Sequence, residues 1–206
     1  MNQRVYIDLI DKNTMDKKEE LASYQRGESE TIMDSSTMKD KTKVLAPSEK
    51  LELCENIGDI FELVKETTDR SIGQRRAGLT LYISDLPPYI GAMHQIGSNA
   101  IIMNRFVLDA LKTSDELRKD ANPFIYVILL HEYLHALGYA EEADVRMIAY
   151  KIAMNSFGEG HKTTEFLKKG LSTILPQILE VTEKRSKIPY LEIVKDFDRS
   201  SMPYIS

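Results

Sequence analysis

The most apolar stretch of the chain lies in its middle, over residues 124–137. Within this stretch, strongly polar side chains are confined to three positions in the second half. Pro123 suits the first turn of a helix, Asn122 can cap that helix, and Gly138 can end it. Because a helix that is apolar on all sides lies in the middle of a protein, the pattern predicts a buried helix here.

Upstream, apolar residues recur at the spacing of an amphipathic helix. Ser48 can serve as its N-cap and Gly73 as its end, so a single helix is predicted between them. The apolar face of this helix, which we expect to pack in the core, consists of Leu51, Cys54, Ile57, Phe61, Val64 and Thr68.

A small sheet is predicted between this helix and the central one. Residues 79–84 alternate apolar and polar side chains, as a half-buried strand does. Two shorter candidate strands, residues 92–96 and 100–103, are separated by the turn residues 97–99. This arrangement predicts a β-hairpin.

Helical patterns dominate the remaining segments. Residues 106–112 and 141–155 favour helices, and residues 163–185 favour a further helix that is kinked or broken at Pro176. Combined with the strands, they predict an α+β fold. In this fold a small mixed sheet packs on the buried central helix, the C-terminal half is helical, and an active-site cleft lies between them.

The N-terminal part of the chain is poor in large apolar residues. Residues 11–43 are mostly charged or small and polar, and such a segment buries too little surface to offset its ordering entropy. A short strand over residues 5–10 can precede it. We therefore predict a flexible arm over residues 1–45 and one domain over residues 46–206.

Composition narrows the classes of partner. The chain has 206 residues and a formal net charge of −5, and phosphate contacts need clustered Lys and Arg, so no nucleic-acid partner is expected. Its longest uninterrupted apolar run, residues 124–130, is far shorter than the roughly 20 residues of a membrane-spanning helix. The N-terminal residues do not resemble a secretory signal, and the one cysteine cannot form an internal disulfide. These features predict a cytoplasmic protein without a membrane partner.

The three polar positions of the central helix carry the chemistry. His131, Glu132 and His135 form an H-E-x-x-H pattern. Residues i and i+4 share one helix face, so the two imidazoles can bind one zinc ion, with each nitrogen about 2.0–2.1 Å from the metal. Glu132 is rotated away from this pair and can take a proton from a water held by the metal. Because burying these groups without a partner costs several kcal/mol, metal binding is favoured over two hydrogen-bonded core histidines.

A catalytic zinc site needs a third protein ligand and an open position for water. Glu141 and Glu142 follow the glycine that ends the predicted helix, and either carboxylate can return to the metal. His94 and His161 are the competing candidates. Asp144 is a candidate acceptor for the outer N–H of a ligand histidine, or simply a solvated helix residue.

At these residues the sequence resembles the zincins, the zinc metallopeptidases built on an H-E-x-x-H helix. The stretch HEYLHALGYAE matches the metzincin motif H-E-x-x-H-x-x-G-x-x-H at His131, Glu132, His135 and Gly138. Glu141 stands where that motif has its third histidine, whereas gluzincins take a glutamate from the next helix as third ligand. The resemblance implies a zincin-like fold, a zinc cofactor, and a peptide or protein substrate.

Two further features of zincins have counterparts here. Metzincins have a methionine turn beneath the metal, and Ser201-Met202-Pro203-Tyr204 resembles it. By this resemblance Met202 forms the floor of the site, and Tyr204 assists the oxyanion or the metal. His94 is a second candidate for the oxyanion, although an exposed strand residue is the commoner role for such a histidine. Residues 92–96 or 100–103 are candidates for a sheet edge that an extended substrate joins by main-chain pairing.

Two alternative functions share the metal site. A bacterial endoribonuclease family that matures ribosomal RNA has the pattern H-G-x-L-H-x-x-G-x-D-H, which this chain matches at residues 131, 134, 135 and 138. However, Glu132 replaces its glycine and Glu141 replaces its third histidine. The other alternative is a zinc-binding protein without catalysis.

Overall fold

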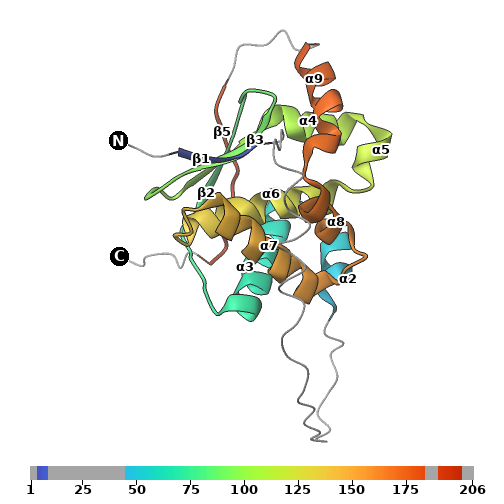
Figure 1. Cartoon of the computed structure of the whole chain (residues 1–206). Helices are drawn as coiled ribbons and strands as arrows, with labels where there is room; N and C mark the ends of the chain where they lie inside the picture. The colour runs from blue at the N-terminus through green and yellow to red at the C-terminus, as the bar shows by residue number, and fades with distance from the viewer. Residues whose placement is uncertain (1–3, 9–44, 184–189, 201–206) are drawn as a thin grey trace, which may run out of the picture.

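The computed structural model describes residues 4–8, 45–183 and 190–200 (Figure 1). In chain order, the helices and strands of this part are β1 (Arg4–Asp8), α2 (Pro47–Glu52), α3 (Ile57–Ile72), β2 (Thr80–Ser84), β3 (Ile90–Gln95), β4 (Ala100–Asn104), α4 (Arg105–Thr113), α5 (Asp115–Arg118), α6 (Ala121–Ala136), α7 (Glu142–Phe157), α8 (Lys162–Lys169), the 3₁₀ helix η1 (Ser172–Ile174), α9 (Leu175–Glu183) and β5 (Glu192–Ile193).

The strands form one mixed sheet in the order β1-β3-β4-β2-β5. β2 and β4 are parallel, whereas the other neighbouring pairs are antiparallel. The predicted hairpin is confirmed as β3 and β4, and the turn between them uses Gly97 at a φ of 81°. The predicted α+β class is confirmed in its general form, a small mixed sheet with mostly helical surroundings.

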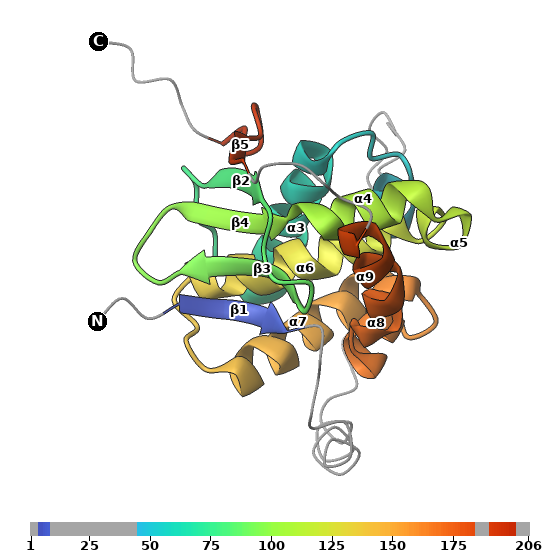
Figure 2. The same cartoon turned by 90° about the horizontal axis from the view of Figure 1, so that it is seen from above.

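α6 is the central element of the fold. It packs against β1 and β3 of the sheet, and against α3, α7 and α8 on its other sides (Figures 1 and 2). Every residue from position 124 to position 136 is buried, as the apolar pattern predicts. None of the helices in the described part of the chain is long and apolar enough to cross a membrane.

The single helix predicted from Ser48 to Gly73 is wrong, because the structure has two helices, α2 and α3, with a break between them. The cap of α2 is Ala46 rather than Ser48, and the Asn56 side chain accepts a hydrogen bond from the Asp59 N–H at 3.0 Å, which starts α3. A side chain of α6 donates hydrogen bonds to two main-chain carbonyl groups at this break.

That side chain is Asn122, which was predicted to cap α6. It lies instead inside the first turn, and its Nδ2 donates to the carbonyl oxygens of Leu51 and Cys54, both at 3.0 Å. The helix predicted over residues 163–185 is likewise interrupted earlier than expected, at Gly170, which ends α8. Pro176 lies in the first turn of α9, where its missing N–H costs nothing.

The expectation of a free edge at β3 or β4 is also wrong. In the sheet formed by the described residues, β3 lies between β1 and β4, and β4 lies between β3 and β2. The strand at the edge beside α6 is β1, which the sequence pattern assigned to the N-terminal arm. The rest of that arm, residues 9–44, lies outside the described residues.

The C-terminal described segment holds α3 beneath α6. The Phe197 ring stacks on Phe61 of α3 at a centroid distance of 4.0 Å, and Phe61 meets the Tyr133 ring of α6 edge-on at 5.4 Å. One residue beyond Phe197, Asp198 forms a buried ion pair with Lys65 at 2.6 Å. The helix that carries the H-E-x-x-H pattern is therefore supported on both sides, by the sheet and by α3.

Candidate metal centre

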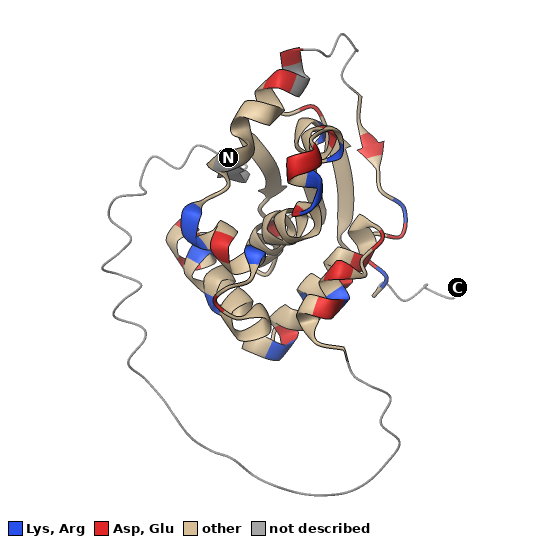
Figure 3. Cartoon of the chain, turned by 90° about the vertical axis from the view of Figure 1, so that its right-hand side faces the viewer, with Lys and Arg blue, Asp and Glu red and all other residues tan. Residues whose placement is uncertain are grey.

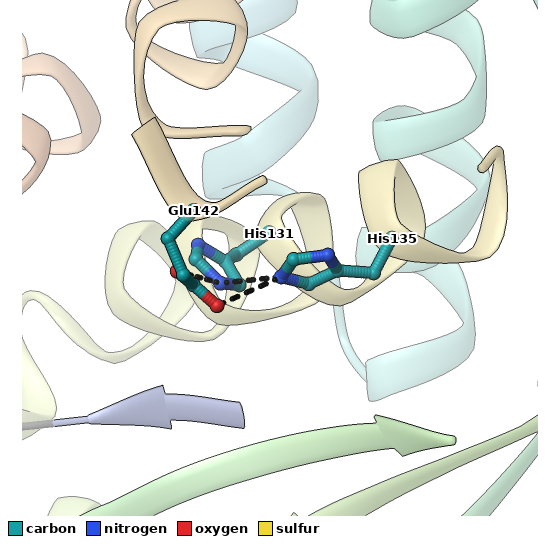
Figure 4. Close-up of side chains that lie close together, drawn as sticks. All are labelled: His131, His135 and Glu142. Atoms are coloured by element: carbon teal, nitrogen blue, oxygen red, sulfur yellow. Dashed lines mark hydrogen bonds and ion pairs between the residues drawn. The ribbon is translucent and has the colours of Figure 1, made fainter. Parts of the chain in front are cut away.

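The two histidines of α6 face one another. Their side chains lie one turn apart, and the Nε2 atoms of His131 and His135 are 3.1 Å from each other (Figure 4). Both residues are almost wholly buried, with exposed fractions of 3% and 2%. The convergence expected from the i, i+4 spacing is therefore present.

A turn at Gly138 brings the next helix back to this pair. Gly138 has a φ of 109°, a left-handed conformation that glycine adopts without strain, and its N–H donates to the His135 carbonyl at 3.0 Å. α7 then begins at Glu142. One Glu142 oxygen lies 3.4 Å from His131 Nε2, and the other lies 3.2 Å from His135 Nε2 (Figure 4).

The structure separates the two adjacent glutamates that the sequence left open. Glu141 is the N-cap of α7, has an extended backbone with ψ at 125°, and is exposed. Only Glu142 joins the histidines among the described residues. Its position at the first turn of α7 also places a carboxylate at the positive end of the helix dipole.

Hydrogen bonding prepares His135 for a metal. Its Nδ1 lies 2.7 Å from the carbonyl oxygen of Tyr139, and because a carbonyl can only accept, Nδ1 carries the proton. The neutral ring then presents the Nε2 lone pair to the centre of the group. An outer-shell acceptor that fixes the tautomer in this way is the usual arrangement for a metal-binding histidine.

The electrostatics of the group favour the forms that bind metal. Burial lowers the pKa of His131, and this effect outweighs the neighbouring Glu142 carboxylate, which raises it. Burial alone would raise the pKa of Glu142, but the two imidazoles next to its carboxylate hold that pKa well below the ordinary range. His131 is therefore neutral and Glu142 ionised near neutral pH.

The donor set fits a zinc ion. The ligand atoms of His131, His135 and Glu142 all lie within 4.8 Å of one another. In a tetrahedral site with bonds of about 2.0–2.1 Å, neighbouring ligand atoms are separated by about 3.3 Å, close to the separations found here. When both Nε2 atoms are unprotonated, a cation between them and the carboxylate would offset the repulsion of their lone pairs.

Glu132 lies beside this group on α6. Its exposed fraction is 0%, and it follows His131 directly, so it leaves the helix about 100° away from that histidine. It is not among the residues that converge as metal ligands. A buried carboxylate at this position has the chemistry of a proton acceptor for a reaction at the centre.

His94 was expected to be more commonly an exposed strand residue, and that expectation is wrong. It is fully buried, because β3 is covered by β1 and packs on α6. Its Nδ1 donates to the Ala100 carbonyl at 2.9 Å, and its Nε2 has no hydrogen-bond partner among the described residues. Burial lowers the pKa of His94, the contact with the Ala100 carbonyl raises it, and the positive charge of Arg76 lowers it again, so that the net shift is downward.

The other competitor for the third ligand lies elsewhere. His161 caps α8 through its Nδ1, which accepts from the Thr163 N–H, and its ring stacks on Phe157 at 4.8 Å. Neither His94 nor His161 belongs to the converging group. Asp144, the candidate outer acceptor, is exposed on α7.

Cys54, from the predicted apolar helix face, is not among the converging residues of the described chain. Cys54 is half-buried beside α2, and burial raises the pKa of its thiol to about 11, so it is not a reactive thiolate. Met202 and Tyr204, the residues of the methionine-turn resemblance, lie outside the described residues. The roles inferred for them remain predictions.

Sequence reasoning missed Arg76, which precedes β2 and ties α6 to the hairpin. Its guanidinium donates to the Ala136 carbonyl at the end of α6, to the Ser98 carbonyl at 2.9 Å, and to Asn99 Oδ1 at 2.6 Å. The pattern of Arg75-Arg76 contains no signal for this, because the contacts join segments that are distant in sequence.

Comparisons with models of known protein families, with curated proteins and with solved structures found no match.

Proposed function

We propose that this chain is a zinc-dependent peptide hydrolase with a zincin-like fold, and that its substrates are peptides or proteins. The observation that supports this most strongly is the convergence of His131, His135 and Glu142 beside the buried Glu132. Two imidazoles and one carboxylate are a common protein ligand set for catalytic zinc, which keeps one position open. The resemblance of the stretch HEYLHALGYAE to zincin motifs points the same way.

The reaction follows from the residues around the centre. Zinc supplies a Lewis acid that lowers the pKa of a water and polarises the scissile carbonyl. Glu132 accepts the proton of the attacking water and passes it to the amine that leaves as the peptide bond breaks. The buried surroundings of α6 strengthen these electrostatic interactions, because little water screens them.

Peptide hydrolysis is favoured over the endoribonuclease alternative for two reasons. Glu132 supplies a carboxylate at the position where that RNA-processing family has glycine, which carries no proton acceptor. The chain is also acidic overall, and Figure 3 shows acidic and basic positions mixed along the described helices. RNA backbone recognition depends on clustered basic side chains.

The test is the variant Glu132→Gln, which keeps the shape of the side chain but removes the proton acceptor. We expect it to retain zinc and to cleave a fluorogenic peptide library about 10²–10⁴-fold more slowly than the wild type. Glu141→Gln, an exposed change close to the site, is the matched control and should cleave at the wild-type rate. A chelator should abolish cleavage by the wild type and by the Glu141→Gln variant.

Three results would contradict the proposal in different ways. Cleavage that survives complete removal of zinc excludes a metallopeptidase. Cleavage of RNA but not of peptides by the zinc-loaded protein favours the endoribonuclease. Zinc binding without cleavage of either substrate indicates a non-catalytic zinc protein.

A further inference from the structure

β1 covers the edge of β3 that faces the metal centre. It pairs with β3 in antiparallel register from Arg4 opposite Gln95 to Ile7 opposite Ala92, and it is the outermost strand on this side of the described sheet. It also packs against α6. In Figure 4, the end of β1 lies below Glu142 and His131.

The position of β1 is the one that an extended peptide would occupy if it paired with the edge of β3. A peptide that adds to a sheet edge forms main-chain hydrogen bonds with the edge strand, as β1 does with β3. A peptide paired with β3 beside α6 would therefore occupy the position of β1. Peptide and β1 cannot both be paired with the same edge.

The attachment of β1 differs from that of its neighbours. β4 follows β3 through a short turn, whereas β1 is separated from β3 by most of the N-terminal half of the sequence. Pairing over such a long loop costs more chain entropy than closing a hairpin. A register shift between Ile7 and Asp8 also interrupts the pairing. β1 also has one strand partner, β3, whereas β4 is paired on both sides, with β3 and with β2.

We propose that β1 occupies the peptide-binding edge of β3, and that an extended peptide reaches the metal centre by displacing β1 and pairing antiparallel with β3. This inference rests on the proposed function, since it names how the substrate of that site is bound and how access is controlled. β1 then competes with the peptide for the edge of β3, and the release of β1 from β3 sets the rate at which peptides bind.

A reversible covalent lock tests the inference in the full-length chain. Tyr6 and Met93 are directly opposed, and Met93 lies between two fully buried residues, so its side chain points to the sheet face away from α6. Directly opposed residues of antiparallel strands have Cα separations of about 4.5–5.5 Å, within the range of a disulfide. The double variant Tyr6→Cys/Met93→Cys, made with Cys54→Ser, fixes β1 to β3 when oxidised.

The matched control is a second lock at the other edge of the same sheet. Tyr82 of β2 and Ile193 of β5 are also directly opposed in an antiparallel pair. Tyr82→Cys/Ile193→Cys, again with Cys54→Ser, therefore introduces a comparable crosslink far from the metal centre. Both proteins are loaded with zinc and compared before and after reduction with a phosphine.

With a fluorogenic peptide library, we expect the oxidised β1–β3 lock to cleave at least about tenfold more slowly than its reduced form, because the edge cannot open. The β2–β5 lock should cleave equally fast in both states. Equal rates for the oxidised and reduced β1–β3 lock would overturn the inference, since peptide would then bind without displacing β1.

A variant that weakens the β1–β3 pairing controls for the possibility that the disulfide slows cleavage by distorting the fold. Tyr6→Pro removes a main-chain donor from β1 and weakens its pairing. We expect cleavage to rise above the wild-type rate, with the melting temperature of the main domain preserved. Unchanged or slower cleavage in this correctly folded variant would also count against the inference.

Failure of the inference can be distinguished from failure of the proposed function. If no form cleaves peptide, the proposed function fails, and transfer of zinc to a bulky chromogenic chelator then decides the role of β1. Transfer several-fold slower from the oxidised β1–β3 lock than from its reduced form supports a strand that covers the centre. Equal transfer rates overturn that role.

Discussion

Three side chains from two helices define the candidate centre at the scale of single residues. The Nε2 atoms of His131 and His135 and the carboxylate of Glu142 lie 3.1 to 3.4 Å apart. The main-chain carbonyl of Tyr139 fixes the proton of His135 on the outer nitrogen. Two imidazole nitrogens and a carboxylate that converge on one point form a group that could hold a metal ion.

The distinction between adjacent glutamates gives a residue-scale prediction. Glu142→Gln removes the negative ligand and should weaken zinc binding by more than about 100-fold, a larger effect than loss of an outer-shell partner. Competition with a fluorescent zinc chelator measures this. Glu141→Gln differs by one position and should bind zinc as the wild type does. Equal losses in both variants would show that Glu142 is not the third ligand.

At the scale of elements, one arginine fixes α6 relative to the β3–β4 hairpin. The Arg76 guanidinium joins the end of α6 to the turn between β3 and β4. The Tyr133 hydroxyl, from within α6, accepts from the Arg76 N–H at 2.7 Å. These bonds satisfy a carbonyl at the helix end and fix the helix just before the turn that carries Glu142 into place.

Removal of the Arg76 hydrogen bonds is predicted to destabilise the fold. Arg76→Ala leaves several acceptors unpaired and should lower the free energy of unfolding by about 1–3 kcal/mol. For a domain of this size that corresponds to roughly 2–4 °C in melting temperature per kcal/mol, measurable by calorimetry. The neighbouring Arg75 is exposed, and its guanidinium donates to the Ser200 hydroxyl at 3.1 Å. Arg75→Ala should therefore change the melting temperature much less, and a similar loss in both variants would refute this role.

At the scale of the whole molecule, the segment from β5 to residue 200 closes the fold against α3. Lys65 is fully buried and pairs with Asp198 at 2.6 Å and with Glu62 at 2.7 Å. Asp198 also accepts from the Leu79 N–H at 3.1 Å, which links the segment to the start of β2. A buried cation is tolerated only with such partners, so the C-terminal segment and α3 depend on each other.

This ion pair predicts how stability depends on pH. Burial alone would raise the pKa of Asp198, but its bonds to Lys65 and to main-chain N–H groups lower that pKa below the ordinary value. The stabilisation is therefore complete above the unfolded-state pKa of about 3.9 and is lost as the pH falls through the lower folded-state value. Asp198→Asn should cost about 3 kcal/mol at neutral pH and should flatten the loss of stability below about pH 4.

Urea unfolding at a series of pH values measures this effect. Asp196→Asn is the matched control, because Asp196 is exposed and lies two residues away. Its pH profile should follow that of the wild type. An Asp198→Asn protein with the wild-type stability at neutral pH would show that the buried pair contributes nothing.

Much of the architecture could be predicted from local patterns. The continuous apolar run predicted α6, alternation predicted β2, and the turn residues 97–99 predicted the β3–β4 hairpin. The i, i+4 spacing placed His131 and His135 on one helix face. The break between α2 and α3 was missed, because the apolar periodicity continues through it. Asn122 satisfies that break from a distant part of the chain, and no local signal reports such a contact.

The sequence by itself determined which helix is buried and which two imidazoles meet, because both follow from the repeat of a single helix. The tertiary structure alone decided that Glu142 rather than Glu141 joins them, since one residue turns a side chain by about 100° and the turn at Gly138 sets where α7 begins. It also decided that His94 is buried and that β1 covers β3. Strand order and burial depend on contacts between distant segments, which the local pattern of a chain does not encode.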